Sequence, residues 1–189
     1  MKKNQTFKAA IFGGSFDPPH IGHINIVKEC LDKCDIDRIF IVPTYLNPFK
    51  DRFHAPSKLR YEWLRRIFEK YEKVEVLDFE ISKKRAVATI ETVRYIYDKY
   101  SPKELYVIIG ADNLQDLHKW REFEKLQQMV KFVVASRDNI KIPPNLINLK
   151  ISDNISSTKL REDMDERFLP SLVKDEIIKF YKEKNEKQN

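Results

Sequence analysis

Cysteine, glycine and histidine are scarce in this chain, which has two cysteines, four glycines and four histidines among 189 residues. Cys30 and Cys34 cannot form a disulfide framework, which excludes a disulfide-rich secreted fold and favours a reducing compartment. They lie one turn apart on the apolar face of a predicted helix, where core packing is favoured over metal binding. No apolar run approaches the length of a membrane span. Because Gly13 and Gly14 interrupt the first apolar stretch before it reaches signal-peptide length, we expect a cytoplasmic protein.

The remaining composition is that of a globular protein, with 42% hydrophobic and 34% charged residues. This length predicts one domain, residues 1–189, with a sizeable core. The net charge of +6 suggests a polyanionic partner, yet basic and acidic residues alternate along the chain, as in residues 161–167. Such mixing favours a solvated surface and no nucleic-acid partner, because a nucleic-acid site calls for a basic stripe interleaved with aromatics.

Short apolar runs alternate with amphipathic segments from end to end. Most runs are too uniformly apolar for burial on one side only, which is typical of central parallel strands covered on both faces. The alternation predicts an α/β fold with a doubly wound, mostly parallel sheet. A short helical C-terminal extension is expected around residues 172–181. The predicted strands are residues 8–13, 38–43, 73–79, 104–110, 131–136 and 145–151.

Three of the four glycines and two of the four histidines fall within "IFGGSFDPPHIGH", residues 11–23. The stretch follows the first predicted strand and leads into a helix that starts near Gly22. Ligands of such sheets bind beyond the carboxyl ends of the strands, where strand order reverses. Gly13 and Gly14 permit unusual backbone angles and let a ligand approach closely. His20 and His23 then reach the free amides of a helix N-terminus, which predicts a phosphate site.

Two other interpretations of this stretch each lack residues that they require. A zinc site from His20 and His23 would need further ligands, and none with suitable spacing accompanies them, so no protein metal site is predicted. A dinucleotide-binding fingerprint would read GxGxxG after the first strand, and that pattern is absent. The loop therefore favours phosphate binding by another route than that of the dehydrogenases.

A second constellation follows the last apolar run, in "ISSTKLRED", residues 155–163. Ser156 and Ser157 are natural helix N-caps, and Thr158 follows them. Arg161 lies one turn beyond Thr158 on the same helix face, where its guanidinium can bind an anion with two hydrogen bonds. The same pattern also fits an ordinary capped surface helix.

Taken together, the GSFDPPHxGH loop and the ISSTxxR helix start resemble the nucleotidyltransferases of the HxGH type. Within them, the chain is similar over nearly its whole length to the bacterial nicotinate-mononucleotide adenylyltransferases. The supporting segments are "VPTYLNPFK", "IIGADN", "HKW" and "VVASR". The resemblance implies a Rossmann-like fold and transfer of the adenylyl group of ATP to nicotinate mononucleotide. The products would be deamido-NAD and pyrophosphate, and Mg²⁺ would be bound mainly through the ATP phosphates.

The resemblance also implies roles for individual residues. His20, His23 and Arg161 would be catalytic. The nicotinate mononucleotide would be bound by Lys50 at its phosphate and by Thr89 and Trp120 at its ring. His54 and His118 are expected to be surface or loop residues. The ATP site would comprise Gly13, Gly14, Ser15, Phe16, His20, His23, Gly110, Asp112, Arg137, Ser157, Thr158 and Arg161.

Several alternatives stay open at this stage. Relatives usually have tyrosine where this chain has Ala88, and often histidine where it has Phe49, so the acceptor could instead be nicotinamide mononucleotide or phosphopantetheine. A nucleotide-binding sensor without turnover is an alternative of another class, although it would not need transition-state groups such as His20, His23 and Arg161. Taken alone, Trp120 also fits a core residue, and Thr89 and Asp112 fit helix caps. The sequence leaves open whether the chain forms a homo-oligomer.

Overall fold

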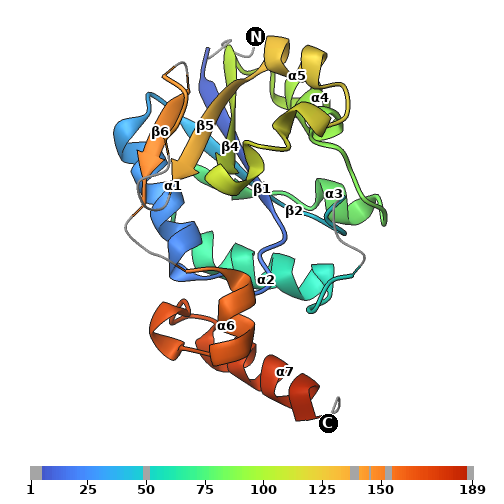
Figure 1. Ribbon diagram of the computed structural model, residues 1–189, viewed down its shortest axis with the longest axis vertical. Coiled ribbons are helices and arrows are strands. Elements are labelled where there is room, and N and C mark those ends of the chain that lie inside the picture. The colour runs from blue at the N-terminus through green and yellow to red at the C-terminus, as the bar shows by residue number, and fades with distance from the viewer. Residues whose placement is uncertain (1–5, 49–51, 137–140, 145, 152–154, 187–189) are drawn as a thin grey trace.

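A computed structural model describes residues 6–48, 52–136, 141–144, 146–151 and 155–186 of the chain. Figure 1 shows a sheet flanked by helices, with the C-terminal helices at the end of the molecule opposite the N-terminus. The strands are β1 (Lys8–Gly14), β2 (Arg38–Pro43), β3 (Val74–Val76), β4 (Glu104–Gly110), β5 (Lys131–Ser136) and β6 (Ile147–Lys150). The α-helices are α1 (Ile21–Lys33), α2 (Ser57–Phe68), α3 (Phe79–Ser82), α4 (Thr89–Tyr100), α5 (Phe123–Met129), α6 (Ser157–Asp163) and α7 (Lys174–Glu186). Short 3₁₀ helices follow at η1 (Ala111–Asn113), η2 (Leu117–Lys119) and η3 (Glu166–Phe168).

The sheet has six strands in the order β3-β2-β1-β4-β5-β6, and all neighbouring pairs are parallel. The predicted doubly wound α/β fold is confirmed. The order reverses between β1 and β4, so the loops after these two strands border the crevice where such sheets bind ligands. Two predicted strands were too long. β3 spans only Val74–Val76, because the chain turns into α3 almost at once. β6 spans only Ile147–Lys150 and is a mostly exposed edge strand.

Alternate side chains of the central strands enter two separate cores, one on each face of the sheet. Ala10 and Phe12 of β1 pack with residues of α1, α2, α6 and α7. Ala9 and Ile11 of the same strand pack with residues of α4 and α5. Because successive side chains of a strand point to opposite faces, apolar residues at every position of β1 place apolar surface on both sides. The uniformly apolar runs in the sequence thus correspond to strands covered on both faces.

The predicted C-terminal extension is a helix, α7, which begins at Lys174 and ends at Glu186. Ile177 and Tyr181 of this helix are buried in the core that contains α2. The ring of Trp63 in α2 lies 6.0 Å from that of Phe180 and 6.4 Å from that of Tyr181. Apolar burial therefore fixes α7 against α2.

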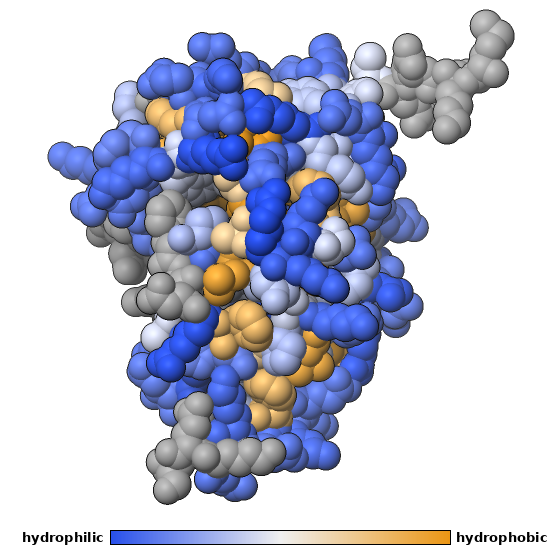
Figure 2. Space-filling view, turned by 90° about the vertical axis from the view of Figure 1, so that its right-hand side faces the viewer, coloured by the Kyte–Doolittle hydropathy of each residue, from blue (hydrophilic) through white to orange (hydrophobic). Residues whose placement is uncertain are grey.

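Hydrophilic residues dominate the face shown in Figure 2, and hydrophobic ones are visible mainly in a band down its middle. Among the described residues, the large hydrophobic side chains that are exposed are Phe53, Ile147 and Leu172. No helix in the described part of the chain has the length and apolar character needed to cross a bilayer.

Trp63→Ala should lower the free energy of unfolding by about 3–5 kcal/mol, because the substitution removes a buried ring and leaves a cavity between α2 and α7. Amide hydrogen exchange in α7 should rise with it. Leu172→Ala is the control: its side chain is 56% exposed, and truncation there should change stability by no more than about 0.5 kcal/mol. Unaltered urea denaturation of Trp63→Ala would show that α7 docks without this contact.

Candidate active site

The end of β1 and the loop that follows it lie at the switch point. Gly13, near the end of β1, is exposed there. A Cβ at Gly13 would have only the carbonyl oxygen of Val42 nearby, at 3.9 Å, so a ligand can approach the backbone. Gly13 and Gly14 do not use the unusual backbone angles that glycine permits, since no described glycine has a positive φ. The left-handed residue is Phe16, with φ of 49°. Its buried ring packs on Phe12 at 5.3 Å, so only its main chain can face a nucleotide.

The two histidines of the loop meet at the start of α1. Their rings are stacked with centroids 3.7 Å apart, and His20, the N-cap residue, is almost fully buried. The backbone amide of His20 donates to Nδ1 of His23 at 3.1 Å, which leaves Nε2 of the half-buried His23 as its donor. A Cβ at Gly22 would lie 3.0 Å from Nδ1 of His20 and 3.0 Å from Ile155. Glycine is therefore needed between the histidines for close packing.

The buried carboxylate of Asp17 joins this loop to two distant segments. Its Oδ2 accepts from the backbone amide of His54 at 2.7 Å, and its Oδ1 accepts from that of Ala55 at 2.9 Å. Oδ1 also accepts from the hydroxyl of Tyr181 in α7. Burial raises the pKa of Tyr181, so this phenol stays a neutral donor. Asp17 therefore holds the 54–55 turn and α7 against the loop.

Helix α6 brings the second motif onto the same loop. Ser156 is its N-cap and accepts from the amide of Lys159, as the sequence predicted. The hydroxyl of Ser157 donates to the carbonyl of Pro18 at 2.9 Å. The guanidinium of Arg161 donates to the carbonyl of Asp17 and, at 3.1 Å, to the hydroxyl of Thr158. The two predicted motifs, far apart in sequence, are thus in direct contact.

A polar cavity of about 360 Å³ opens between this loop and the segment after β2. Ser15, Thr158 and Arg161 line it, together with His54, which the sequence had placed only at the surface or in a loop. The pKa of His54 is lowered, mainly by burial and also by the charge of Arg161, so this imidazole is mostly neutral at pH 7. The full lining is Ser15, Asp17, Thr44, Tyr45, Leu46, Asn47, Arg52, Phe53, His54, Arg60, Thr158 and Arg161.

A second cavity, of about 300 Å³ and more apolar, lies beyond the ends of β1 and β4. Thr89, the first residue of α4, and the half-buried Trp120 both line it, as do Gly13, Gly14 and Gly110. Thr89 is not the N-cap, which is Ala88. Because α4 begins here, its free amides border the cavity. The polar and the apolar cavity share Thr44 and Asn47, so they adjoin.

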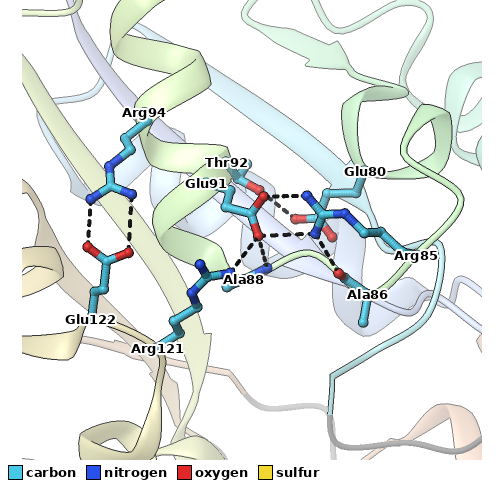
Figure 3. Close-up of polar contacts among 9 residues, drawn as sticks. All are labelled: Glu80, Arg85, Ala86, Ala88, Glu91, Thr92, Arg94, Arg121 and Glu122. Atoms are coloured by element: carbon cyan, nitrogen blue, oxygen red, sulfur yellow. Dashed lines mark hydrogen bonds and ion pairs between the residues drawn. The ribbon is translucent and has the colours of Figure 1, made fainter.

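An ion-pair network joins α4 to the segment before it and to the turn after β4, beside the apolar cavity (Figure 3). Glu91 of α4 accepts from Arg85 at 2.6 Å, from Arg121 at 3.4 Å and from the amide of Ala88 at 3.4 Å. The hydrogen bond from Arg85 is the main reason that the pKa of Glu91 is lowered. The carboxylate therefore ties the segment that carries Thr89 to the turn that carries Trp120.

Arg60 of α2 is a buried residue of the site that no sequence motif indicates. Its guanidinium donates to the carbonyls of Ala55 and Thr44, each at 2.9 Å, of Tyr45 at 3.1 Å, and of Ser15. In the described part of the chain, no carboxylate forms an ion pair with it. Burial lowers its pKa, but arginine remains charged at neutral pH. The sequence did indicate that Arg60 is buried, because it shares the apolar face of the helix with Trp63 and Leu64.

The remaining predicted residues are placed less directly. His20, His23 and Asp112 border neither cavity. Asp112 is exposed on η1 and accepts from the side-chain amide of Asn113 at 3.3 Å. A Cβ on Gly110 would lie 2.3 Å from a carboxylate oxygen of Asp112, so the exposed Asp112 side chain would have to move to admit one. Lys50 and Arg137 lie outside the described residues.

Arg60→Met should destabilise the protein by about 2–4 kcal/mol and raise the KM for ATP, because several buried carbonyls lose a charged donor. Arg60→Lys should recover only part of the loss, since an ammonium cannot span the same carbonyls. Arg65→Met is the matched control on the same helix, where the side chain is 59% exposed. Equal stability and equal KM in the Arg60 and Arg65 variants would contradict this role.

Comparison with known proteins agrees with the geometry. The cytidylyltransferase-like family model matches residues 11–163. The chain is 53% identical over 175 residues to the "Probable nicotinate-nucleotide adenylyltransferase" of Nitratiruptor sp., covering 93% of this chain and 99% of the relative. It is 47% identical over 174 residues to the protein of the same name from Campylobacter jejuni, covering 92% and 96%.

Among solved structures, Plasmodium falciparum nicotinic acid mononucleotide adenylyltransferase complexed with NaAD has the same fold. Its TM-score is 0.78 at 22% identity, and the match covers 93% of this chain and 98% of that one. The loop after β1 and the start of α6 both lie within the residues that the family model matches. The chain belongs to the cytidylyltransferase-like family and, within it, to the nicotinate-nucleotide adenylyltransferases.

Proposed function

We propose that the chain transfers the adenylyl group of ATP to nicotinate mononucleotide, giving deamido-NAD and pyrophosphate. The observation that carries the proposal is the pair of adjoining cavities, which share Thr44 and Asn47. The polar one, with Arg161 and Thr158, suits the polyphosphate of ATP, and the apolar one, with Trp120, suits a pyridine ring. A reaction that joins two anionic nucleotides needs two such sites side by side.

The chemistry that this site must promote is an in-line displacement. An oxygen of the mononucleotide phosphate forms a bond to the α-phosphorus of ATP. The bond from that phosphorus to its bridging oxygen breaks, and pyrophosphate leaves with the electron pair. The attacking phosphate is already ionised, so no general base is required. Alignment of the two anions and neutralisation of the growing charge on pyrophosphate are required.

The described residues can supply these functions. We assign Nε2 of His23 as a donor to the transferred phosphoryl group, because Nδ1 already accepts from the backbone of His20. Arg161, held by the carbonyl of Asp17 and by Thr158, would neutralise the β- and γ-phosphates. Trp120 would stack on the pyridine ring, and Thr89 with the amides at the start of α4 would bind its carboxylate.

Magnesium would enter with ATP and neutralise part of the charge on its phosphates. In the described segments, no group of three or more His, Cys, Asp or Glu side chains is arranged to hold a metal ion. The carboxylate of Asp17, in the wall of the polar cavity, is already engaged by two amides and Tyr181. The residues therefore fit a cation bound mainly through the nucleotide phosphates.

The acceptor is identified by measuring pyrophosphate release with ATP and, in turn, nicotinate mononucleotide, nicotinamide mononucleotide and phosphopantetheine. We expect kcat/KM for the acid to exceed that for the amide about tenfold or more. The amide would direct donor hydrogens at the donors of Thr89 and α4, and each opposed donor costs about 1–3 kcal/mol. Equal values, or a preference for either other acceptor, would contradict the nicotinate assignment but not adenylyl transfer from ATP.

Arg161→Ala should lower kcat by about 10²–10³, because losing one donor to charge that grows in the transition state has this cost. The control is Arg167→Ala on η3, where the side chain is 83% exposed and paired with Asp165. Thermal unfolding of both variants separates catalysis from the structural bond of Arg161 to the Asp17 carbonyl. A folded Arg161→Ala enzyme with near-normal kcat would remove this residue from the site.

A further inference from the structure

Glu80 of α3 is a buried acidic residue in the wall of the apolar cavity. Its side chain is 5% exposed, and one carboxylate oxygen, Oε1, accepts from the hydroxyl of Thr92 in α4 at 2.7 Å (Figure 3). The other oxygen, Oε2, is buried and forms no hydrogen bond with any described residue. Buried polar atoms are normally paired, so an unpaired oxygen at the wall of a ligand cavity points to a ligand partner.

The charges around Glu80 come from three other segments. Glu91 on α4 is held ionised by Arg85 and Arg121, and its negative charge opposes ionisation of Glu80. Lys119 and Arg121 line the same cavity from the segment after β4. On its inner side, α3 contacts β2, whose charged residue, Arg38, lies at the opposite end of the strand. Arg85, in the segment after α3, also lies near Glu80 but pairs with Glu91. In the described part of the chain, no cation forms an ion pair with Glu80.

Burial is the main cause of a raised pKa for Glu80, from 4.5 to about 7. The carboxyl is therefore mainly neutral below neutral pH and mainly ionised above it. In the neutral form, it carries a hydroxyl that can donate to an anion. In the ionised form, it can only accept, and it repels an anion.

We propose that Glu80 is a specificity-determining residue of the acceptor site, which recognises the exocyclic group on the pyridine ring of the mononucleotide. This inference rests on the proposed function. Neutral Glu80 donates from Oε2 to the carboxylate of nicotinate. Ionised Glu80 instead accepts from the amino group of nicotinamide. The preference for acid over amide is therefore greatest below the pKa of Glu80 and declines as pH rises through it.

The test compares kcat/KM for nicotinate and nicotinamide mononucleotide at about pH 6 and about pH 8, on either side of that pKa. Titration of the shared phosphate and of groups such as His54 affects both acceptors and largely cancels in the ratio. In the unmodified enzyme, we expect the ratio of acid to amide to fall about tenfold across this range, the effect of one hydrogen bond replaced by repulsion. A constant ratio would overturn the proposal.

Glu80→Gln separates recognition from structure, because its amide oxygen can still accept from Thr92 while its amino group permanently replaces the acid hydroxyl. The variant should prefer the acid at both pH values, with a ratio that no longer depends on pH. Glu69→Gln, which removes an exposed carboxylate at the end of α2, should retain the pH dependence. A Glu80→Gln enzyme that keeps the pH-dependent ratio would show that Glu80 only supports Thr92.

A binding measurement covers the case in which Glu80→Gln loses activity. At about pH 8, calorimetry in buffers of different ionisation enthalpy should show proton uptake when nicotinate mononucleotide binds the unmodified enzyme, since the ligand favours neutral Glu80. The uptake should vanish in Glu80→Gln, and equal uptake in both proteins would overturn the proposal. Failure of the proposed function has a different signature: neither pyridine mononucleotide would then be adenylylated at any pH.

Discussion

The geometry of the site depends on the hydrogen bonds that the buried guanidinium of Arg60 donates. One rigid, permanently charged group donates to main-chain carbonyls of the loop after β1, the segment after β2 and the turn before α2. A fixed side chain that donates to the backbone carbonyls of several loops holds those loops in one conformation, because each buried carbonyl would otherwise lack a hydrogen-bond donor. The cation also lies in the wall of the polar cavity, so the group that fixes the loops adds positive potential where phosphates are expected.

Asp17 complements Arg60, because its carboxylate accepts hydrogen bonds whereas the guanidinium of Arg60 donates them. It receives two backbone amides and the phenol of Tyr181, while its own carbonyl accepts from Arg161. Lys184 of α7 adds a bond to the carbonyl of His54 at 2.7 Å. The C-terminal helix is therefore connected to the loop after β1 by hydrogen bonds as well as by apolar packing. A perturbation of α7 is transmitted to the loop through Tyr181, and not only through loss of core.

The two cavities differ in the way their walls are held. The polar cavity is bordered by loops tied through buried groups, Arg60 and Asp17. The apolar cavity is bordered by α4 and the turn that carries Trp120, which are joined at the surface by the pair of Glu91 with Arg121 (Figure 3). Glu91 also pairs with Arg85 in the segment before α4. Surface pairs each contribute little stability, about 0–1 kcal/mol, and are screened by salt. The apolar cavity therefore has the more adaptable wall.

The sequence by itself determined the order of strands and helices, the parallel sheet and the two motifs for which anion binding is proposed. These features follow from local patterns: uniformly apolar runs, amphipathic periodicity, and Ser156 as an N-cap before Thr158 and Arg161. It also placed Thr89 and Trp120 together, although only through resemblance to relatives. The sequence did not show where the first loop takes a positive φ: glycine permits this conformation, but Phe16 adopts it.

Only the tertiary structure decided what Arg60, Asp17, Tyr181 and Glu80 do. Each is an ordinary residue in its local pattern, and its role arises from partners up to 164 positions away, as for Tyr181 and Asp17. The pKa of Glu80 likewise depends on burial that no local sequence pattern encodes. Hydrogen-bond partners and desolvation are set by how elements distant in the chain pack together. Local sequence patterns therefore identified the two motifs that meet at the polar cavity, and the fold determined which buried groups hold them in place.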